Sequence, residues 1–288
     1  MFKKTSSKIL LAAALLIINL ILWQSILFKE PASGALSITF LDVGEGDAIL
    51  IDDSFGNQIL IDGGYDSQKL LTKLDKAMPF HDRRIELVML THPDDDHLNG
   101  ILSVLGRYQV KNFLYSGLKK DSVHYQDLIA LLKKEHLPMQ IAQRGQDVVL
   151  ANGADLYILY PEESLENASV KDLNEYSLVS KLVFGEFSLL LPGDSGRMAE
   201  ARLLSSGLNL ESQVLKVGHH GSKYSTHPLF LMRVNPKVAA ISVGKNSYGH
   251  PTPEVLERLK NVLTLRTDLN GDIKIQTDGR KMQIVTEK

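Results

Sequence analysis

One short segment holds the densest group of chemically active side chains in the chain. Two histidines, His92 and His97, enclose three consecutive aspartates, Asp94, Asp95 and Asp96. Crowded carboxylates repel one another, and protonation or a multivalent cation is the usual means of holding them together. Imidazole nitrogen and carboxylate oxygen are common ligands of zinc, manganese and iron. The pattern predicts a metal site, whereas three aspartates alone would be typical of a solvated turn that caps a helix.

The elements around this segment must position its side chains. The apolar run Leu87–Leu90 just before it is typical of a buried strand. His92, Asp94 and Asp96 alternate, so an extended loop would direct them to the same side. We expect a helix to begin at Leu98. The local prediction is therefore a strand, a ligand-bearing loop and a helix.

Polar side chains also follow other predicted strands, at the point where each strand ends. Strand ends on one edge of a layered sheet are where sites usually assemble. One such residue would mean little, but several together favour a shared site. Asp62 is expected to orient a metal-binding histidine or to cap the next helix. The residues at strand ends are Asp62, Asp194, the pair His219 and His220, and His250.

The composition of the whole chain limits the function classes. The chain has 288 residues, of which 44% are hydrophobic and 23% charged, as in a folded soluble protein of one large domain or two. Its formal net charge of −2 argues against a broad basic nucleic-acid surface, although a metal site or local lysines could still hold phosphates. Because the chain has no cysteine, disulfides and thiolate ligands are excluded.

The N-terminal residues 1–34 have a different composition from the rest. Lysines precede the apolar run Ile9–Phe28, which is long enough to cross a bilayer as a helix. The position of these lysines places the N-terminus in the cytoplasm. We therefore predict an uncleaved signal anchor (about residues 9–28) and a linker, in a single-pass protein of the cell membrane. Cleavage near Ala35 would instead give a secreted protein.

Residues 35–288 show short β-rich runs that alternate with amphipathic helices, which predicts a layered α/β structure. In both halves a strand ends on a polar turn before a helix, and this repetition predicts two sheets with helices outside. A hairpin is expected at the end, turning at Asp278 and Gly279. The predicted helices cover residues 67–77, 98–108, 122–135, 197–205 and 254–263.

Taken together, these motifs resemble those of the metallo-β-lactamase superfamily, and in particular the hydrolase domain of ComEC-type competence proteins. The resemblance extends from about Ile38 onward and implies an αββα sandwich. The segments that carry it are Asp42–Asp47, Asp62–Gly64, Thr91–His97, Pro192–Asp194, Val217–Ser222 and Tyr248–Pro251.

The resemblance implies two divalent metal ions, zinc or manganese, at neighbouring positions. One position would be formed by Asp96, His97, a bridging Asp194 and one histidine of the following pair. We favour His220 as the ligand and His219 as a substrate contact, a choice that the spacing alone leaves open.

The second metal position departs from the superfamily pattern twice. His92 is present, but Asp94 stands where the superfamily usually has a histidine, and Asn174 stands at the place of its next histidine. This position is therefore expected to bind its ion weakly, to fill only with substrate, or to suit a harder ion. Zinc and manganese both fit the whole ligand set, and its three carboxylates, Asp94, Asp96 and Asp194, favour manganese.

The resemblance also implies roles in hydrolysis. Asp96 would bind metal and orient the attacking hydroxide, while His219 and His250 would contact the scissile phosphate or protonate the leaving oxygen. Ser222 and Lys223 are candidates for further phosphate contacts, and Lys216 and Lys245 are expected to add local positive charge.

Three functions follow as alternatives. The first is an extracytoplasmic phosphodiesterase or DNA nuclease related to DNA uptake, with DNA as its partner; no protein partner is predicted. The second is a hydrolase of another phosphoester or a lactone, such as a phosphocholine-type group of the cell wall, since one fold hosts many chemistries. The third is a catalytically idle binding module, which the departures at Asp94 and Asn174 leave open.

Overall fold

The computed structural model describes residues 34–166 and 168–288. The predicted membrane segment, residues 9–28, lies outside these ranges. Within them, no helix combines the length and the apolar character that crossing a membrane requires.

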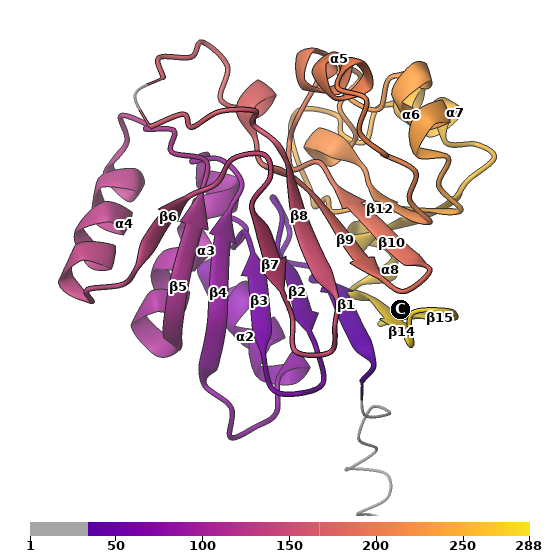
Figure 1. Cartoon of the computed structure of the whole chain (residues 1–288). Helices are drawn as coiled ribbons and strands as arrows, with labels where there is room; N and C mark the ends of the chain where they lie inside the picture. The colour runs from indigo at the N-terminus through magenta and orange to yellow at the C-terminus, as the bar shows by residue number, and fades with distance from the viewer. Residues whose placement is uncertain (1–33, 167) are drawn as a thin grey trace, which may run out of the picture. The chain divides into compact units, whose positions relative to one another are not determined.

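Two β-sheets lie face to face, with helices on both outer sides (Figure 1). This arrangement confirms the predicted αββα sandwich. In spatial order, the first sheet contains β15 (Met282–Thr286), β14 (Ile273–Thr277), β1 (Leu36–Phe40), β2 (Ile49–Asp52), β3 (Gln58–Ile61), β4 (Arg84–Leu90), β5 (Gln109–Tyr115) and β6 (Met139–Ile141). The second contains β13 (Leu263–Arg266), β12 (Val238–Ile241), β11 (Val214–Lys216), β10 (Phe187–Leu191), β9 (Val179–Phe184), β8 (Asp155–Tyr160) and β7 (Asp147–Val149).

Helices cover the outer face of each sheet (Figure 1). The α-helices are α2 (Ser67–Ala77), α3 (Asp95–Arg107), α4 (Val123–Lys134), α5 (Arg197–Ser205), α6 (Pro228–Val234), α7 (Pro253–Arg258) and α8 (Thr267–Asn270), and the 3₁₀ turns are η1 (Asn174–Tyr176) and η2 (Gly218–Gly221). The amphipathic patterns of α2, α3 and α4 place their apolar residues against the first sheet, and α5 and α6 pack on the second.

Strand β4 shows how the layers are held. Leu87 and Met89 belong to the apolar core between the two sheets, whereas Val88 and Leu90 belong to the core under the helices. Successive residues of a strand point to opposite faces, so a strand with helices on one side and a second sheet on the other must be apolar at nearly every position. The buried strand predicted before His92 is therefore confirmed.

The parallel parts of the two sheets bring the polar strand ends together. Strands β3, β4 and β5 run parallel in the first sheet, and β10, β11 and β12 run parallel in the second. Asp62 follows β3 and His92 follows β4, while Asp194 follows β10 and His220 follows β11. The carboxyl ends of both sets of strands thus supply the residues of a single site.

Helix α3 begins earlier than expected. Asp94 is its N-cap and the helix starts at Asp95, not at Leu98. Asp96 and His97 consequently project from the first helical turn, and the predicted extended alternation of ligands is wrong. Acidic residues are favoured there by the partial positive charge of the helix N-terminus.

The prediction was also wrong near the C-terminus. The helix expected over residues 254–263 ends at Arg258, and Leu263 begins β13, which pairs in parallel with β12. Helix α6 was not predicted. The C-terminal hairpin is present as β14 and β15, and β14 pairs with β1 at the other end of the chain.

Candidate metal centre

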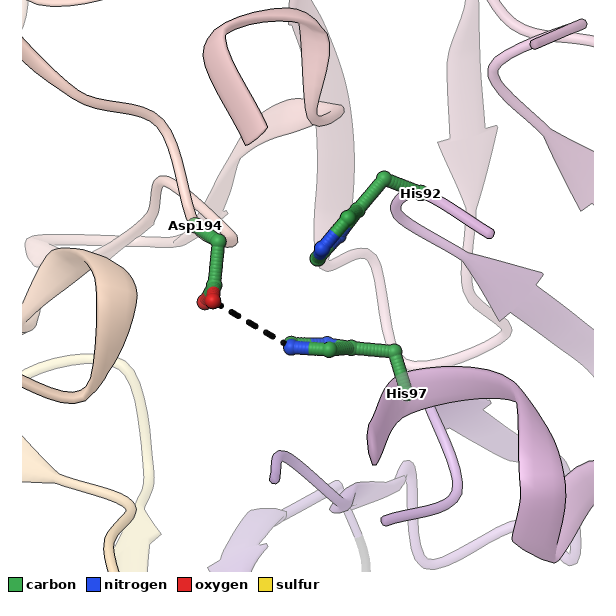
Figure 2. A group of neighbouring side chains, drawn as sticks. All are labelled: His92, His97 and Asp194. Carbon is green, nitrogen blue, oxygen red and sulfur yellow. Dashed lines mark ion pairs between the residues drawn. The ribbon is translucent and has the colours of Figure 1, made fainter. Parts of the chain in front are cut away.

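Three side chains from separate segments point toward one another beyond the carboxyl ends of the strands (Figure 2). His92 follows β4, His97 lies in the first turn of α3, and Asp194 follows β10. The His97 Nε2 atom lies 3.4 Å from Asp194 Oδ2, and the rings of His92 and His97 are 4.2 Å apart between centroids. One potential ligand atom from each residue lies within 4.8 Å of the other two.

His220 completes this cluster from the second sheet. Its Nε2 atom lies 3.1 Å from Asp194 Oδ2 and 3.4 Å from Asp96 Oδ2. Asp96 Oδ2 is also 3.8 Å from His97 Nε2. The ring of His219 lies 6.2 Å from that of His220 and packs instead against His250. The geometry therefore places His220, and not His219, beside the carboxylates.

The backbone at the histidine pair adopts a rare conformation. His219 and His220 have φ angles of 48° and 51°, in the left-handed region that costs a residue with a Cβ atom on the order of 1–3 kcal/mol. The ring of His220 is fixed in addition by a 2.9 Å contact from Nδ1 to the carbonyl oxygen of Ser242. With the Nδ1 proton donated to this carbonyl, the Nε2 lone pair faces Asp96 and Asp194.

The unpaired atoms at the centre of the cluster fit a cation. The Nε2 atoms of His92, His97 and His220 are all buried and have no hydrogen-bond partner. A buried polar atom without a partner costs free energy, so each such atom calls for an explanation. Ring nitrogens that face carboxylates suit a divalent ion, and the absence of sulfur agrees with the oxygen-rich set expected from the sequence.

Asp62 supports the cluster from below. Its Oδ2 atom lies 2.8 Å from His97 Nδ1, and its two oxygens also accept hydrogen bonds from the backbone N–H and the hydroxyl of Thr91. Asp62 therefore orients His97, which was one of the two roles considered for it. The other role, capping α2, belongs to Asp66, which accepts a hydrogen bond from the N–H of Lys69.

The carboxylates dominate the electrostatics of the cluster. Burial lowers the pKa of His220, but Asp194 and Asp47 outweigh this effect and raise the pKa to about 10. Burial likewise opposes the charge on His97, but Asp194 and Asp96 raise its pKa well above the ordinary value. Burial raises the pKa of Asp194, whereas the neighbouring cationic groups hold it well below its usual range. Positive charge is thus strongly favoured at this point.

A buried lysine supplies part of that charge. Lys216 was expected to add local positive charge, and it does so from inside the fold: its side chain is only 1% exposed and pairs with the buried carboxylate of Asp47. Its Nζ atom also lies 3.3 Å from Asp194 Oδ1 and donates a 2.8 Å hydrogen bond to the carbonyl oxygen of Gly193. Lys216 therefore supplies positive charge beside Asp194, but it does not line the pocket. Asp47 was not among the predicted site residues, although it lies in a segment that carries the family resemblance.

The glycine loop after β1 is shaped by the site. Gly46 has a φ of 97°, and a Cβ atom there would lie 1.7 Å from the carbonyl oxygen of Asp96. Only glycine lets the loop approach the start of α3 so closely. The glycine is thus required by close packing against a residue of the cluster, rather than by a hairpin turn alone.

The side of the site that contains Asp94 is more exposed than the side that contains Lys216. Asp94 Oδ2 lies 3.5 Å from His92 Nε2, and Asp94 Oδ1 lies 2.9 Å from Lys120 Nζ. Burial raises the pKa of Asp94, but His92 and Lys120 lower it to about 2. Among the described residues, Asp94 belongs to none of the groups whose ligand atoms lie within 4.8 Å of one another. Asn174 faces the same space, and its Oδ1 atom is buried without a partner.

A pocket of about 520 Å³ opens over both sides of the site. His219 and His250 lie on its wall, and burial lowers the pKa of both. Ser222 and Lys223 are not among its lining residues; Ser222 is buried, and its Oγ atom accepts a weak 3.4 Å hydrogen bond from a turn N–H. The lining residues are Glu45, Gly46, Tyr65, Asp94, Asp95, Asp96, Lys120, Asn174, Asp194, His219, His220, Val243, Gly244, Asn246, Tyr248 and His250.

Comparison with known proteins agrees with this fold and cluster. Residues 41–245 match the family described as the metallo-beta-lactamase superfamily. The chain therefore belongs to the metallo-β-lactamase superfamily.

Its similarity to individual relatives is more specific. "ComE operon protein 3" of Bacillus subtilis (strain 168) is 29% identical over 88% of this chain and 35% of its own length. "Competence protein ComA" of Neisseria gonorrhoeae is 33% identical over 67% of this chain and 25% of its own length. The predicted resemblance to ComEC-type competence proteins is confirmed. The chain spans about a third or less of the length of these curated relatives.

Solved structures share the fold. Igni18, a metallo hydrolase from Ignicoccus hospitalis, aligns with a TM-score of 0.52 and 16% identity, covering 83% of this chain and 98% of its own. The metallo-beta-lactamase fold protein YhfI from Bacillus subtilis aligns with a TM-score of 0.51 and 11% identity, covering 80% and 95%. At this level of identity, the comparison supports the architecture alone.

Proposed function

We propose that the protein is a membrane-anchored, extracytoplasmic phosphodiesterase that depends on a divalent metal ion and acts on DNA. One observation carries the metal-dependent chemistry. Three buried Nε2 atoms, from His92, His97 and His220, converge near Asp194, which lines an open pocket, and none of them has a hydrogen-bond partner. This arrangement is what a polar site needs in order to hold a cation where a substrate can reach it.

The nitrogen and oxygen ligands of the site form two metal positions in this proposal. Asp96, His97, Asp194 and His220 would hold one ion, and His92 with Asp94 would contribute to a second, weaker one. A divalent ion, zinc or manganese, would polarise a phosphoryl oxygen and lower the pKa of a water molecule. In this proposal Asp96, at the pocket floor, also orients the attacking water.

His219 and His250 are suited to proton transfer. Their rings lie 5.5 Å apart on the pocket wall, and burial lowers the pKa of each, so both are neutral near pH 7. A neutral imidazole can accept a proton from water and return it to a leaving oxygen. Each ring would therefore hold or move a proton without competing for the cation.

The substrate and the location rest on other observations. The names of the curated relatives refer to competence and recombination, which supports DNA and a link to DNA uptake. The lysine-flanked apolar run Ile9–Phe28 supports a membrane anchor with the site on the outer side. Protein partners are not part of the proposal.

The test uses the full chain in detergent, stripped of metal and reloaded with manganese, zinc or magnesium. Single- and double-stranded DNA are supplied as substrates, and the Asp96→Ala variant is run in parallel. We expect metal-dependent cutting that the variant lacks. Bound metal without cutting of either DNA would reject the nuclease, and failure to bind any metal would favour an idle module.

A small phosphoester is the second candidate, and the pocket provides the reason. Its lining includes five carboxylates, Glu45, Asp94, Asp95, Asp96 and Asp194. Such a lining disfavours a long polyanion more than a small substrate. Hydrolysis of bis(4-nitrophenyl) phosphate without cutting of DNA would support this alternative. Hydrolysis of a lactone in preference to either phosphodiester would point to the uncharged substrates instead.

A further inference from the structure

We propose that Lys120 determines the specificity of the pocket by receiving an anionic oxygen of the substrate on the side of Asp94. This inference rests on the proposed phosphodiesterase function and names a residue that sequence analysis did not single out. It implies that anionic esters bind in preference to neutral ones such as lactones.

The charged residues that line the pocket favour contact between an anion and Lys120. Within the part of the chain that the structure describes, Lys120 is the single lysine or arginine among the lining residues. Glu45, Asp95 and Asp96 are carboxylates on the same lining, and each would repel an approaching phosphate. The lysines expected to help lie elsewhere, because Lys216 is buried and Lys223 does not line the pocket. On the side of the pocket away from His220, an anion therefore meets Lys120 as the available lysine or arginine of the described residues.

The position of the Lys120 ammonium group leaves it able to donate hydrogen bonds to a substrate. Lys120 Nζ lies 2.9 Å from Asp94 Oδ1 and 3.8 Å from Asp95 Oδ1. An ammonium group has three donors, and Asp94 uses one of them at hydrogen-bond distance. The side chain is 28% exposed, so it is neither buried in an ion pair nor free in solvent. Donors remain available on the pocket side.

The backbone before Lys120 is firmly held, which favours a defined contact. Lys120 lies between β5 and α4, in a segment where Ser116 and Leu118 are both buried. Gly117 between them has a φ of 85°, and a Cβ atom there would lie 2.9 Å from Ile141 Cγ2. The packed segment fixes the backbone just before Lys120, and the contact with Asp94 holds the ammonium group at the pocket.

The role of Lys120 is separate from that of the buried metal ligands. It contacts Asp94, which does not group with other potential ligands, rather than Asp194 or His220. Its removal should therefore weaken anion binding while leaving the principal metal position intact. This separation makes the proposal testable without reference to turnover.

The experiment uses the full chain in detergent, loaded with manganese, and three variants. Lys120→Met removes the charge, Lys120→Arg keeps it, and Lys119→Met is the matched control, since Lys119 is exposed and does not line the pocket. Calorimetry measures the affinity for inorganic phosphate, elemental analysis measures bound manganese, and thermal melting checks the fold.

We expect Lys120→Met to bind phosphate about tenfold more weakly, which corresponds to about 1.4 kcal/mol. Lys120→Arg should recover most of the affinity, and Lys119→Met should equal the unmodified protein. The manganese bound at the principal position should be the same in all of them. With bis(4-nitrophenyl) phosphate, Lys120→Met should raise KM more than it lowers kcat.

Two results would overturn the inference while the proposed function stands. One is phosphodiester hydrolysis with a phosphate affinity that does not depend on Lys120. The other is loss of manganese in Lys120→Met, which would mean that the residue acts on the metal through Asp94. If the unmodified protein neither hydrolyses a phosphodiester nor binds phosphate, the function and the inference fail together.

Discussion

On both sides of the pocket a lysine neutralises carboxylates, but the two lysines differ in their exposure to solvent. On the buried side, Asp47 and Asp194 share a lysine, Lys216, that is 1% exposed. On the open side, Asp94 pairs with Lys120, whose side chain is 28% exposed. Both pairs join a carboxylate of the site to an ammonium group, but only in the second does the lysine line the pocket that a substrate would enter.

The difference indicates that one side of the site holds its carboxylates rigidly, whereas the other side can exchange its contacts when a substrate binds. A buried ion pair cannot lose one partner without leaving a charge stranded away from water, so the buried side holds Asp194 rigidly. A pair whose side chains are 28% and 27% exposed exchanges its contacts at a lower cost, because water reaches both partners. The buried side is therefore suited to fix ligands, and the open side is suited to accept a substrate.

The largest effect is expected from Lys216→Met. The substitution leaves Asp47 and Asp194 buried without their cation, which should lower the free energy of unfolding by about 3–5 kcal/mol. Lys120→Met should lower it by less than about 1 kcal/mol, as for an exposed pair. Urea unfolding of the two metal-free variants measures the difference. Equal losses would show that the two sides do not differ as described.

The next effect concerns Glu200, a buried acid that helps to hold the loop after the histidine pair. Glu200 accepts hydrogen bonds from the N–H groups of Thr226 and His227, and Ser225 in the same loop donates to the carbonyl oxygen of Gly218. Burial raises the pKa of Glu200 to about 7 from its ordinary 4.5, and the two backbone hydrogen bonds offset only part of this.

Because the pKa of Glu200 is higher in the folded state, protonation favours folding. Its contribution is complete below about pH 4.5 and is lost as the pH rises through about 7, with a total on the order of 3 kcal/mol. We expect Glu200→Gln to flatten the pH dependence of stability over this range. Urea unfolding of metal-free protein at pH 5 and pH 8 tests it. An unchanged slope in the variant would assign the pH dependence to other groups.

A smaller effect is expected from Asp62→Asn, which tests how far metal binding on the buried side depends on the hydrogen bond between Asp62 and His97. The amide keeps an acceptor for His97 but loses the charge that makes the imidazole a better ligand. Metal affinity should fall by about 10–100-fold. Competition with a chelator measures it. Asp66→Asn is the control, since Asp66 caps α2 away from the cluster; an equal loss in this control would mean that Asp62 acts only through the fold.

The same contrast explains what could be predicted from the sequence. The fold followed from apolar periodicity and from polar residues at strand ends, because both are local patterns imposed by the layers. The pairing of β14 with β1 was not predicted, since nothing local records a contact between the two ends of a chain. Residues 254–263 were predicted as one helix, yet Leu263 pairs with Val238 in a sheet. Tertiary packing decided that segment.

For the site, the clustering of the proposed ligands was predicted, but the positions of the lysines were not. The roles of the metal ligands remain predictions, but the structure brings His92, Asp96, His97, Asp194 and His220 together. The lysines were misjudged, because a sequence does not show which of several lysines is buried. Lys216 stands just before a recognisable motif and was expected to add positive charge, but the sequence did not show that this charge is buried in ion pairs. Lys120 lies in no motif, and only its place on the pocket wall identifies it.

The smallest effect is expected from Asn174→His, which would make the open side more like the buried one. Asn174 lines the pocket, and its buried Oδ1 atom has no partner. An imidazole there adds a nitrogen ligand near His92 and Asp94, so the affinity for a second manganese ion should rise by about tenfold, while the stability of metal-free protein changes by less than about 1 kcal/mol. Elemental analysis over a manganese titration measures the ratio of ions to chains. If the ratio already reaches two in the unmodified protein at the same concentration, the amide oxygen serves as a ligand, and the open side is a complete metal position rather than a place for the substrate's charge.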